Sequence, residues 1–408
     1  MDRPRREMIS STLRKLHAFS RRLLVRVLLI AALVVLAVAL AKIVGAFLPP
    51  ELDGLISAQA VDNVLSIIAN SMLTVTTFSL TVMAAAHRMV SNAWTPRAHQ
   101  MLLEDTTTHT VLATFVGAYL YALMAIILRD MDVFRAEELV VLFAVTVLVV
   151  VLIVTAIIRW ISHLEMLGSL IETAQRIEDR TAQALTLRSR FPTLGARVLD
   201  PDRVPAAAIT VRAETSGYLR QVYQDVLQEA AETAEGHVWL ALPVGEFVYQ
   251  GQVLARVDRN DDRLKQAVRD NLLLGSLRNF DQDPEFGLLC LSEIGVRALS
   301  PGVNDPGTAV DMLRRMGRVM MSVNTAMTGG GEETPHDRLF LPALDTAAMV
   351  RVTLGPLLMD GADRPELAAP VDQLLEALRG HADRGIAAAA DRLFRDYRAS
   401  SAFTVPEM

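Results

Sequence analysis

The sequence predicts an α-helical membrane domain of four transmembrane helices, followed by an α+β, mostly helical cytoplasmic region with a small β-module. Two observations support this fold class. Four long apolar runs lie within the first 160 residues, and the rest of the chain has none. That remainder instead mixes amphipathic helical patterns with short alternating patterns typical of strands. Because an α-helix rises about 1.5 Å per residue, about 20 apolar residues cross the hydrocarbon core, and each run is long enough to do so.

The membrane domain is expected over residues 23–160, where backbone groups must bond within their own segment and therefore form helices. The predicted spans are 23–48, 61–86, 110–128 and 139–158. The first run is longer than the apolar stretch of a signal peptide, and no convincing cleavage site follows it, so it is expected to remain as an anchor. The third run is rich in Ala, which favours close packing inside the bundle. The fourth is almost pure Val, Leu and Ile, which favours contact with lipid.

Basic residues near the apolar runs predict the orientation in the membrane. A basic N-terminus, 1–22, precedes the first run and contains Arg3, Arg5, Arg6, Arg14, Lys15, Arg21 and Arg22, and Arg26 follows in the first turn of the run. The loop 49–60 has no Lys or Arg. The loops 87–109 and 129–138 have two each, so they do little to distinguish the two possible orientations. The N-terminus is therefore expected in the cytoplasm. Four crossings return the C-terminal region to the same side.

The composition of the chain limits the cellular compartments and the partners that are expected for the protein. The single cysteine, Cys290, excludes an intrachain disulfide and suits a reducing compartment. The formal net charge of −6 gives no reason to expect a nucleic-acid partner. The histidines are scattered, and HExxH, GxSxG and CxxC motifs are missing, so no enzyme, cofactor or metal site is expected. The expected partners are the lipid bilayer and further copies of the chain in a homo-oligomer, with a small ligand or ion left open.

A polar stripe follows one side of the second predicted helix. Its members are Asn63, Ser66, Asn70, Thr74, Thr77 and Thr81. Spacings of three and four residues keep these side chains on one helical face. Polar side chains in hydrocarbon are costly unless they find partners or water, so the stripe calls for one or the other.

Two interpretations of the stripe remain open. One is a helix–helix seam, where Ser, Thr and Asn bond across to neighbours or back to their own carbonyls. The other is the wall of a hydrated path for water or an ion. Asn70 favours the path because it lies in mid-membrane with four bonding positions to satisfy. The middle of each span lacks carboxylates and lysines, which argues against a proton relay. One chain with a single polar face is not expected to enclose a pore alone, so a pore requires an oligomer.

The soluble region divides into three parts. Residues 161–200 predict a connecting helix and a linker, 201–260 a small β-rich module, and 261–408 a mostly helical region. Residues 244–255 resemble half of a barrel-sandwich module of the biotinyl or lipoyl type, in which glycines permit tight turns. The Met-Lys-Met-like turn that would carry a cofactor is missing from this sequence. A structural β-module is therefore expected.

The densest turn signal of the soluble region separates two of its predicted helices. Its candidate functional residues are Ser300, Pro301, Gly302, Asn304, Asp305 and Pro306. Asp305 is placed to cap the following helix, with Pro306 at the first helical position. The alternative is a small-ligand or cation site built from Asn304, Asp305 and backbone groups. An anion is disfavoured because Asp305 would repel it at the helix N-terminus.

Several segments are similar to one known family. In the membrane part these are 68–75, 95–97 and 111–121, and the most specific are 281–287 and 297–306 in the soluble region. They resemble the bacterial predicted-membrane-protein family catalogued as domain of unknown function 2254. The resemblance covers most of the chain. It implies four spans in the bacterial inner membrane and a cytoplasmic C-terminal region, and it implies no activity.

Two hypotheses about function follow. The first is an oligomeric channel or pore-like protein, in which the second helix lines the path and the soluble region assembles or gates the subunits. The second is a membrane-anchored sensor or scaffold whose soluble region binds a ligand or a protein partner. A channel predicts that cysteines placed along the stripe react with water-soluble thiol reagents. A seam predicts no reaction, and a loss of stability or assembly in Asn70→Leu.

Overall fold

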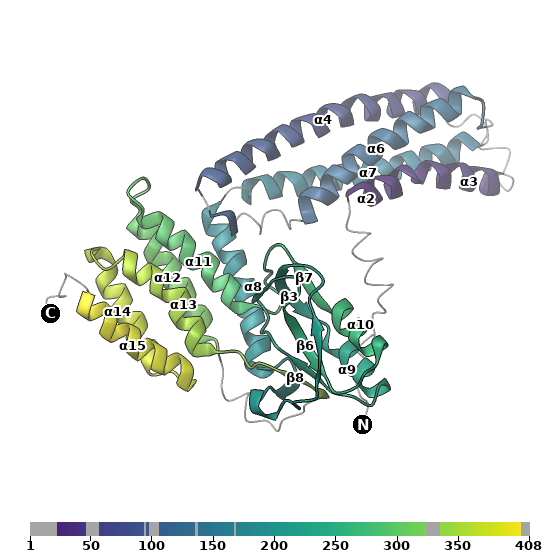
Figure 1. Ribbon diagram of the computed structural model, residues 1–408. Helices are drawn as coiled ribbons and strands as arrows, with labels where there is room; N and C mark the ends of the chain where they lie inside the picture. Colours follow the sequence, from purple (N-terminus) through teal and green to yellow (C-terminus); the bar gives the residue numbers. More distant parts are fainter. Residues whose placement is uncertain are drawn as a thin grey trace, which may run out of the picture. The chain divides into compact units, whose positions relative to one another are not determined.

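The chain folds into two compact units in the computed structural model (Figure 1). The structure describes residues 23–45, 57–93, 95–97, 106–134, 138–166, 169–323 and 335–400. The first unit contains the described residues up to 93 and those from 106 to 169. The second unit contains 95–97 and the described residues from 170 onwards. The predicted basic N-terminus, 1–22, lies outside the described residues.

The first unit is built from apolar helices. Its described helices are α2 (Leu23–Ala31), α3 (Leu33–Gly45), α4 (Ala58–Ala93), α6 (Thr106–Asp130) and α7 (Leu139–Met166). Within the described residues, the segments long and apolar enough to cross a membrane are Val27–Val44, Ala58–Ala85, Thr110–Asp130 and Leu139–Leu164. The four predicted apolar helices are thereby confirmed. The first span consists of α2 and α3, which meet at Ala32 with the bond from Leu36 N to Ala32 O kept at 3.1 Å.

Helix α6 is the most buried of the spans. More than half of its apolar segment is buried, against a third or less for each of the others. Ala118, Ala122 and Ala125 are fully buried, and small residues of this kind let neighbouring helices approach closely. At Gly117 a Cβ would lie only 2.5 Å from the Cβ of Ile30. The predicted internal packing role of this helix is confirmed.

Charged side chains of the first unit pair at helix ends. Lys42 near the end of α3 contacts Glu138, just before α7, at 2.7 Å. Arg129 near the end of α6 pairs with Asp62 near the start of α4. Both pairs therefore lie where helices leave the apolar layer, and this position avoids the cost of a charge within hydrocarbon.

The second unit contains two small sheets. One has the strand order β1-β8-β4-β6-β2 and the other β5-β3-β7. The strands are β1 (Ala196–Val198), β2 (Ile209–Arg212), β3 (Gly217–Val222), β4 (Val238–Leu240), β5 (Phe247–Val248), β6 (Val253–Val257), β7 (Leu272–Gly275) and β8 (His336–Leu341). Strand β8 runs parallel to both of its neighbours, and the other pairs are antiparallel. The β-rich part therefore also draws strands from outside 201–260, namely β1, β7 and β8.

Two helices complete the core of the β-rich part. They are α9 (Gln224–Thr233) and α10 (Asp262–Asn271). Leu227 of α9 and Leu264 of α10 are buried together with Val238 of β4. Tight turns at Gly245 and Gly251, with φ of +96° and +84°, connect this region as the glycine pattern predicts.

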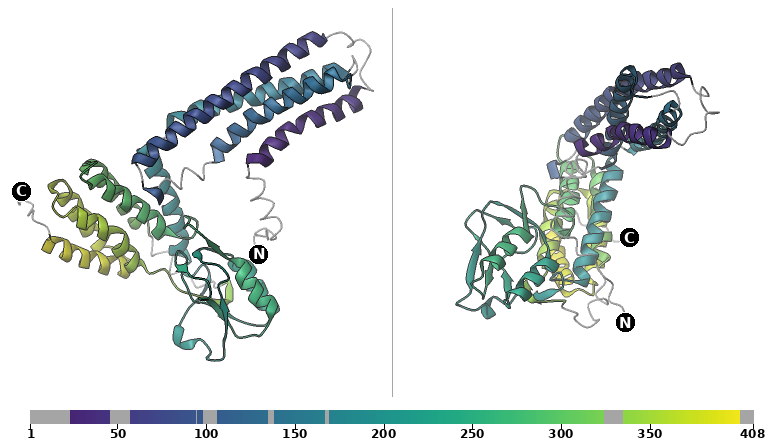
Figure 2. Two further views of the ribbon diagram at one scale, coloured as in Figure 1. Left: turned by 45° about the horizontal axis from the view of Figure 1, so that its top comes forward. Right: turned by 90° about the vertical axis from the view of Figure 1, so that its right-hand side faces the viewer.

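Helices make up the rest of the second unit. They are α8 (Leu170–Arg190), α11 (Pro284–Leu299), α12 (Pro306–Met321), α13 (Thr346–Asp360), α14 (Pro365–Arg379) and α15 (Arg384–Ser400). Figure 2 shows α11 to α15 gathered on one side of this unit and the sheets on the other. Helix α11 is central because it contacts α8, α12 and α13. The mixed helical region with small sheets that the sequence predicts is confirmed.

Candidate functional site

The polar stripe lies on an exposed face of α4. All of its members are exposed: Asn63, Ser66, Asn70, Thr74, Thr77 and Thr81. The buried face of the same helix carries Val61, Leu65, Ile68 and Met72, which belong to the core shared with α6 and α7. Because each residue advances about 100° around a helix, the stripe lies on the side of α4 opposite these core residues. It therefore faces away from the helix bundle of its own chain.

The hydrogen bonds along the stripe differ between its two ends. Three members donate to the carbonyl oxygen four residues earlier, at 3.0–3.1 Å: Thr74, Thr77 and Thr81. Among the described residues, the side chains of Asn63, Ser66 and Asn70 have no hydrogen-bond partner. These three side chains border a shallow hollow of about 680 Å³ with Ile67 and Ser71. Their amide and hydroxyl groups thus reach the surface with bonding capacity left over.

Large apolar side chains flank the stripe on both sides. Ile67 and Phe78 lie along one flank, and Leu73 and Leu80 lie along the other, all of them exposed. Such flanks suit lipid or a neighbouring helix, whereas the polar stripe between them does not suit hydrocarbon. Since the stripe does not face its own bundle, a seam would join separate copies of the chain. The seam and the hydrated path both stay predictions.

The turn between α11 and α12 is built as a helix cap. Asp305 accepts hydrogen bonds from the Thr308 hydroxyl at 2.6 Å and from its backbone N–H at 3.0 Å. These bonds lower the pKa of Asp305 below its usual value. Pro306 occupies the first turn of α12, where a missing N–H costs nothing. The capping role predicted for Asp305 is confirmed.

The other residues of this turn are placed as follows. The Ser300 hydroxyl donates to the carbonyl oxygen of Arg297 at 2.7 Å. Asn304 has a φ of +51°, and its side chain accepts from Arg364 at 2.9 Å. The remaining two lie exposed at the surface: Pro301 and Gly302. These bonds account for the turn as a structural connection, and a ligand site there stays a prediction.

The segment 281–287 joins distant parts of the second unit. The side-chain amide of Gln282 accepts from the Val222 backbone N–H at 2.9 Å and donates to the Val222 carbonyl at 3.1 Å. It thereby extends the hydrogen bonding of β3. Gly287, in the first turns of α11, lies against α8, where a Cβ would meet the Thr181 side chain. The segment is therefore a structural junction between β3, α8 and α11.

A network of charges anchors the start of α11. Asp283 is almost completely buried and receives two bonds from Arg278, at 2.6 and 2.7 Å. Glu285 accepts from the same guanidinium at 3.1 and 3.2 Å. Burial lowers the pKa of Arg278, but the two carboxylates outweigh this effect and the pKa is raised. The carboxylate of Asp283 also caps α11 by accepting from the Phe286 N–H at 3.2 Å.

The single cysteine lies on the buried side of α11. Cys290 is fully buried, and burial raises the pKa of its thiol to about 12. At pH 8 such a thiol has on the order of a thousandfold less thiolate than a thiol with a pKa near 9, and the thiolate is the reactive form. We expect maleimide to label the folded protein at pH 8 at least about a hundredfold more slowly than the urea-unfolded protein. Equal rates, measured by mass spectrometry, would show that Cys290 is accessible.

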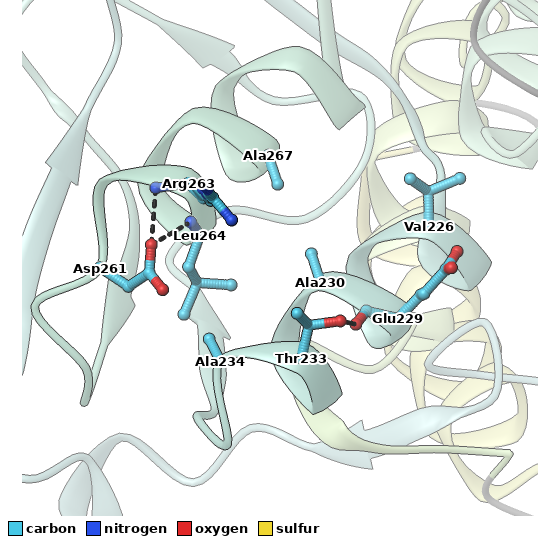
Figure 3. Close-up of a pocket in the computed structure, with 9 residues that line it drawn as sticks. All are labelled: Val226, Glu229, Ala230, Thr233, Ala234, Asp261, Arg263, Leu264 and Ala267. Carbon is cyan, nitrogen blue, oxygen red and sulfur yellow. Dashed lines mark hydrogen bonds between the residues drawn. The ribbon is translucent and has the colours of Figure 1, made fainter.

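A groove separates α9 from α10 (Figure 3). It has a volume of about 440 Å³, and its apolar lining includes Ala230, Leu264 and Ala267. The Asp261 carboxylate accepts from the backbone N–H groups of Arg263 and Leu264, at 2.7 and 3.3 Å, and so caps α10. These contacts belong to helix capping and do not single out a ligand. Among the described residues, no group of three His, Cys, Asp or Glu side chains is placed to hold a metal ion.

Four helices long and apolar enough to cross a membrane, followed by a larger mixed α and β unit, define the class of this chain, a membrane protein with several apolar helices. The chain belongs to the family described as "Predicted membrane protein (DUF2254)", which matches residues 20–379. The resemblance carried by segments such as 281–287 is thereby confirmed.

The curated relatives that match are mycobacterial. Uncharacterized protein Rv1290c of Mycobacterium tuberculosis and uncharacterized protein Mb1321c of Mycobacterium bovis are each 26% identical over 337 residues. The match covers 77% of this chain and 63% of either relative, so this chain spans less than two thirds of their length. No solved structure matches the chain significantly.

Proposed function

We propose that this protein is an oligomeric channel or pore-like protein in which α4 lines a hydrated path across the membrane. The observation that carries the proposal is the exposed position of the whole stripe, opposite the packed face of α4. In a lone chain, the amide of Asn70 would face hydrocarbon without a partner, which is costly. Copies arranged with their α4 helices around a common axis would turn the stripes towards water. Flanking side chains such as Phe78 would then contact neighbouring helices or lipid.

The chemistry of the stripe supports a path with a neutral wall. Amides and hydroxyls can replace part of the hydration shell of an ion without holding it tightly. The Thr74, Thr77 and Thr81 hydroxyls already donate to α4 carbonyls, so their oxygens remain available as acceptors along the path. The proposal therefore includes no strong selection by charge within the span.

We further propose that this protein lies in the bacterial inner membrane with both termini in the cytoplasm. The basic residues before the first span support this orientation. Residues 95–97, between the second and third spans, belong to the same compact unit as the C-terminal region. This shared unit supports a location of both on one side of the membrane, which is the arrangement expected for a chain with four crossings.

Flux through liposomes that contain the purified protein tests the proposed function. In Asn70→Leu and Thr77→Val, we expect salt-driven flux to fall by about tenfold or more, because losing one polar contact raises the barrier by about 1.4 kcal/mol. Thr155→Val is the matched control. Thr155 is an exposed threonine of α7 that also donates to the carbonyl four residues earlier, at 2.8 Å. Its replacement is expected to leave flux unchanged.

Two results would oppose a path lined by α4. One is an equal loss of flux in Thr155→Val and Thr77→Val, which would point to a general disturbance of the helices. The other is a wild-type protein without flux across a range of ions and voltages. That result would favour a membrane-anchored sensor or scaffold, with the stripe as a seam between copies and Asn70→Leu impairing assembly.

A further inference from the structure

The segment that follows α4 is fastened to α11. Helix α4 runs without a break from Ala58 to Ala93, and residues 95–97 then lie in the second unit. Arg97 forms an ion pair with Glu293 of α11. Thr95 beside it is buried, so packing as well as charge holds this segment. Thr95, Arg97 and Glu293 line one shallow cavity of about 500 Å³.

Helix α11 gives this contact a firm support. It packs between α8, α12 and α13, and its start is held by the Arg278–Asp283 pair. Glu293 therefore projects from one of the best-anchored helices of the second unit. By contrast, the Arg97 and Glu293 side chains themselves are 49% and 29% exposed. A pair of this exposure contributes little to folding, so its loss is expected to open the contact locally without unfolding the unit.

We propose that Arg97 and Glu293 position the C-terminal end of α4 and so couple the second unit to the polar path. The inference rests on the proposed function, because it concerns the regulation of the helix that lines the path. Helix α4 has 36 residues with neither Pro nor Gly among them. We expect such a helix to transmit a shift or rotation from one end to the other, since it lacks the two residue types at which sharp kinks most often arise. A partner or ligand that moves α11 would thereby turn or displace the stripe.

The chain contains its own reporter of this contact. Cys290 lies one helical turn before Glu293 and is fully buried, and the positive charge of Arg97 lowers the pKa of its thiol against the larger effect of burial. When the segment 95–97 leaves α11, Cys290 is expected to become accessible to thiol reagents. Its labelling rate then measures how often the contact opens.

The first experiment tests the contact in full-length protein in liposomes. In Arg97→Glu and in Glu293→Arg, we expect Cys290 to react about tenfold faster than in the wild type, because like charges then face each other. The charge exchange Arg97→Glu/Glu293→Arg is expected to restore the rate to within about twofold. Arg398→Glu is the matched control, since it breaks an exposed pair with Asp372 at 3.0 Å elsewhere in the second unit. Unchanged labelling in both single variants, or no restoration in the exchange, would overturn the proposal.

The second experiment tests the coupling to α4. Thr81→Cys, the stripe residue nearest this end of α4, is labelled in a Cys290→Ala background with and without Arg97→Glu. We expect Arg97→Glu to change the labelling rate of Thr81→Cys by about fivefold or more. In the charge exchange Arg97→Glu/Glu293→Arg, the labelling rate is expected to return to its value without these changes. If the Cys290 assay shows opening but the Thr81→Cys rate stays constant, the coupling is refuted while the proposed channel stands. If Thr81→Cys never reacts and the wild type conducts nothing, the channel itself is refuted, and the coupling with it.

Discussion

Asp283→Ala is expected to lower the free energy of unfolding of the second unit by about 3–5 kcal/mol, because it leaves a buried charge short of its partner. Of the two carboxylates that bind its guanidinium, Arg278 would lose the nearer one and keep Glu285, whose contacts at 3.1 and 3.2 Å are longer than those to Asp283. The cap of α11 is lost at the same time, because the Phe286 N–H loses its acceptor. Asp283→Asn keeps a cap acceptor and is expected to fall between wild type and Asp283→Ala.

The control for this prediction lies in the same segment. Asp281 is about half exposed and reaches Arg180 only at 3.6 Å, so Asp281→Ala is expected to change stability by no more than about 0.5 kcal/mol. Urea unfolding followed through the labelling of Cys290 measures both variants, because the single cysteine reports on the second unit alone. A similar loss for Asp281 and Asp283 would contradict the special role of the buried pair.

Gly287→Ala is expected to destabilise the second unit by about 2–4 kcal/mol through overpacking. The added Cβ would lie 1.8 Å from Oγ1 and 2.8 Å from Cβ of Thr181. These separations are far below van der Waals contact, so α8 and α11 would have to move apart. Alanine in place of glycine favours a helix by only about 1 kcal/mol, which does not offset this overlap.

A second glycine provides a control for which the expected change in stability has the opposite sign. Gly355 lies within α13, and a Cβ there would meet nothing within 4 Å. Gly355→Ala is therefore expected to stabilise the unit by about 0.5–1 kcal/mol. The double variant Gly287→Ala/Thr181→Gly is expected to recover at least about 1 kcal/mol relative to the sum of its single changes. If both alanine variants shift the urea midpoint in the same direction, close packing of α8 against α11 is not the cause.

The four apolar helices follow from the sequence alone. Lipid requires about 20 apolar residues with internally satisfied backbone groups, and that demand acts on each segment by itself. The same holds for the cap at Asp305, since a carboxylate reaches the N–H of Thr308 three residues later within one turn of chain. Spacing also places the stripe on a single face of its helix. In each of these cases the interacting groups are neighbours in sequence, so their geometry follows from the helix.

The direction in which the stripe faces depends on tertiary packing. The spacing of the polar residues is the same whether the stripe forms a seam or lines a path. The burial of residues such as Leu65 and Met72 shows that Asn70 faces away from the bundle. Packing likewise brings strand β8 beside β4, although the chain between them forms helices α10, α11 and α12 and strands of both sheets.

The charge contacts of the second unit likewise depend on tertiary packing. Glu178 of α8 accepts from Arg315 and Arg318 of α12 at 2.7–2.8 Å, and the sequence pattern of neither helix points to the other. Arg97 and Glu293 meet only because the segment after α4 lies against α11. The sequence by itself thus determined the spans, the stripe and the caps, which rest on contacts within a few residues. Tertiary structure alone decided which distant side chains meet, because those contacts require the packing of whole elements.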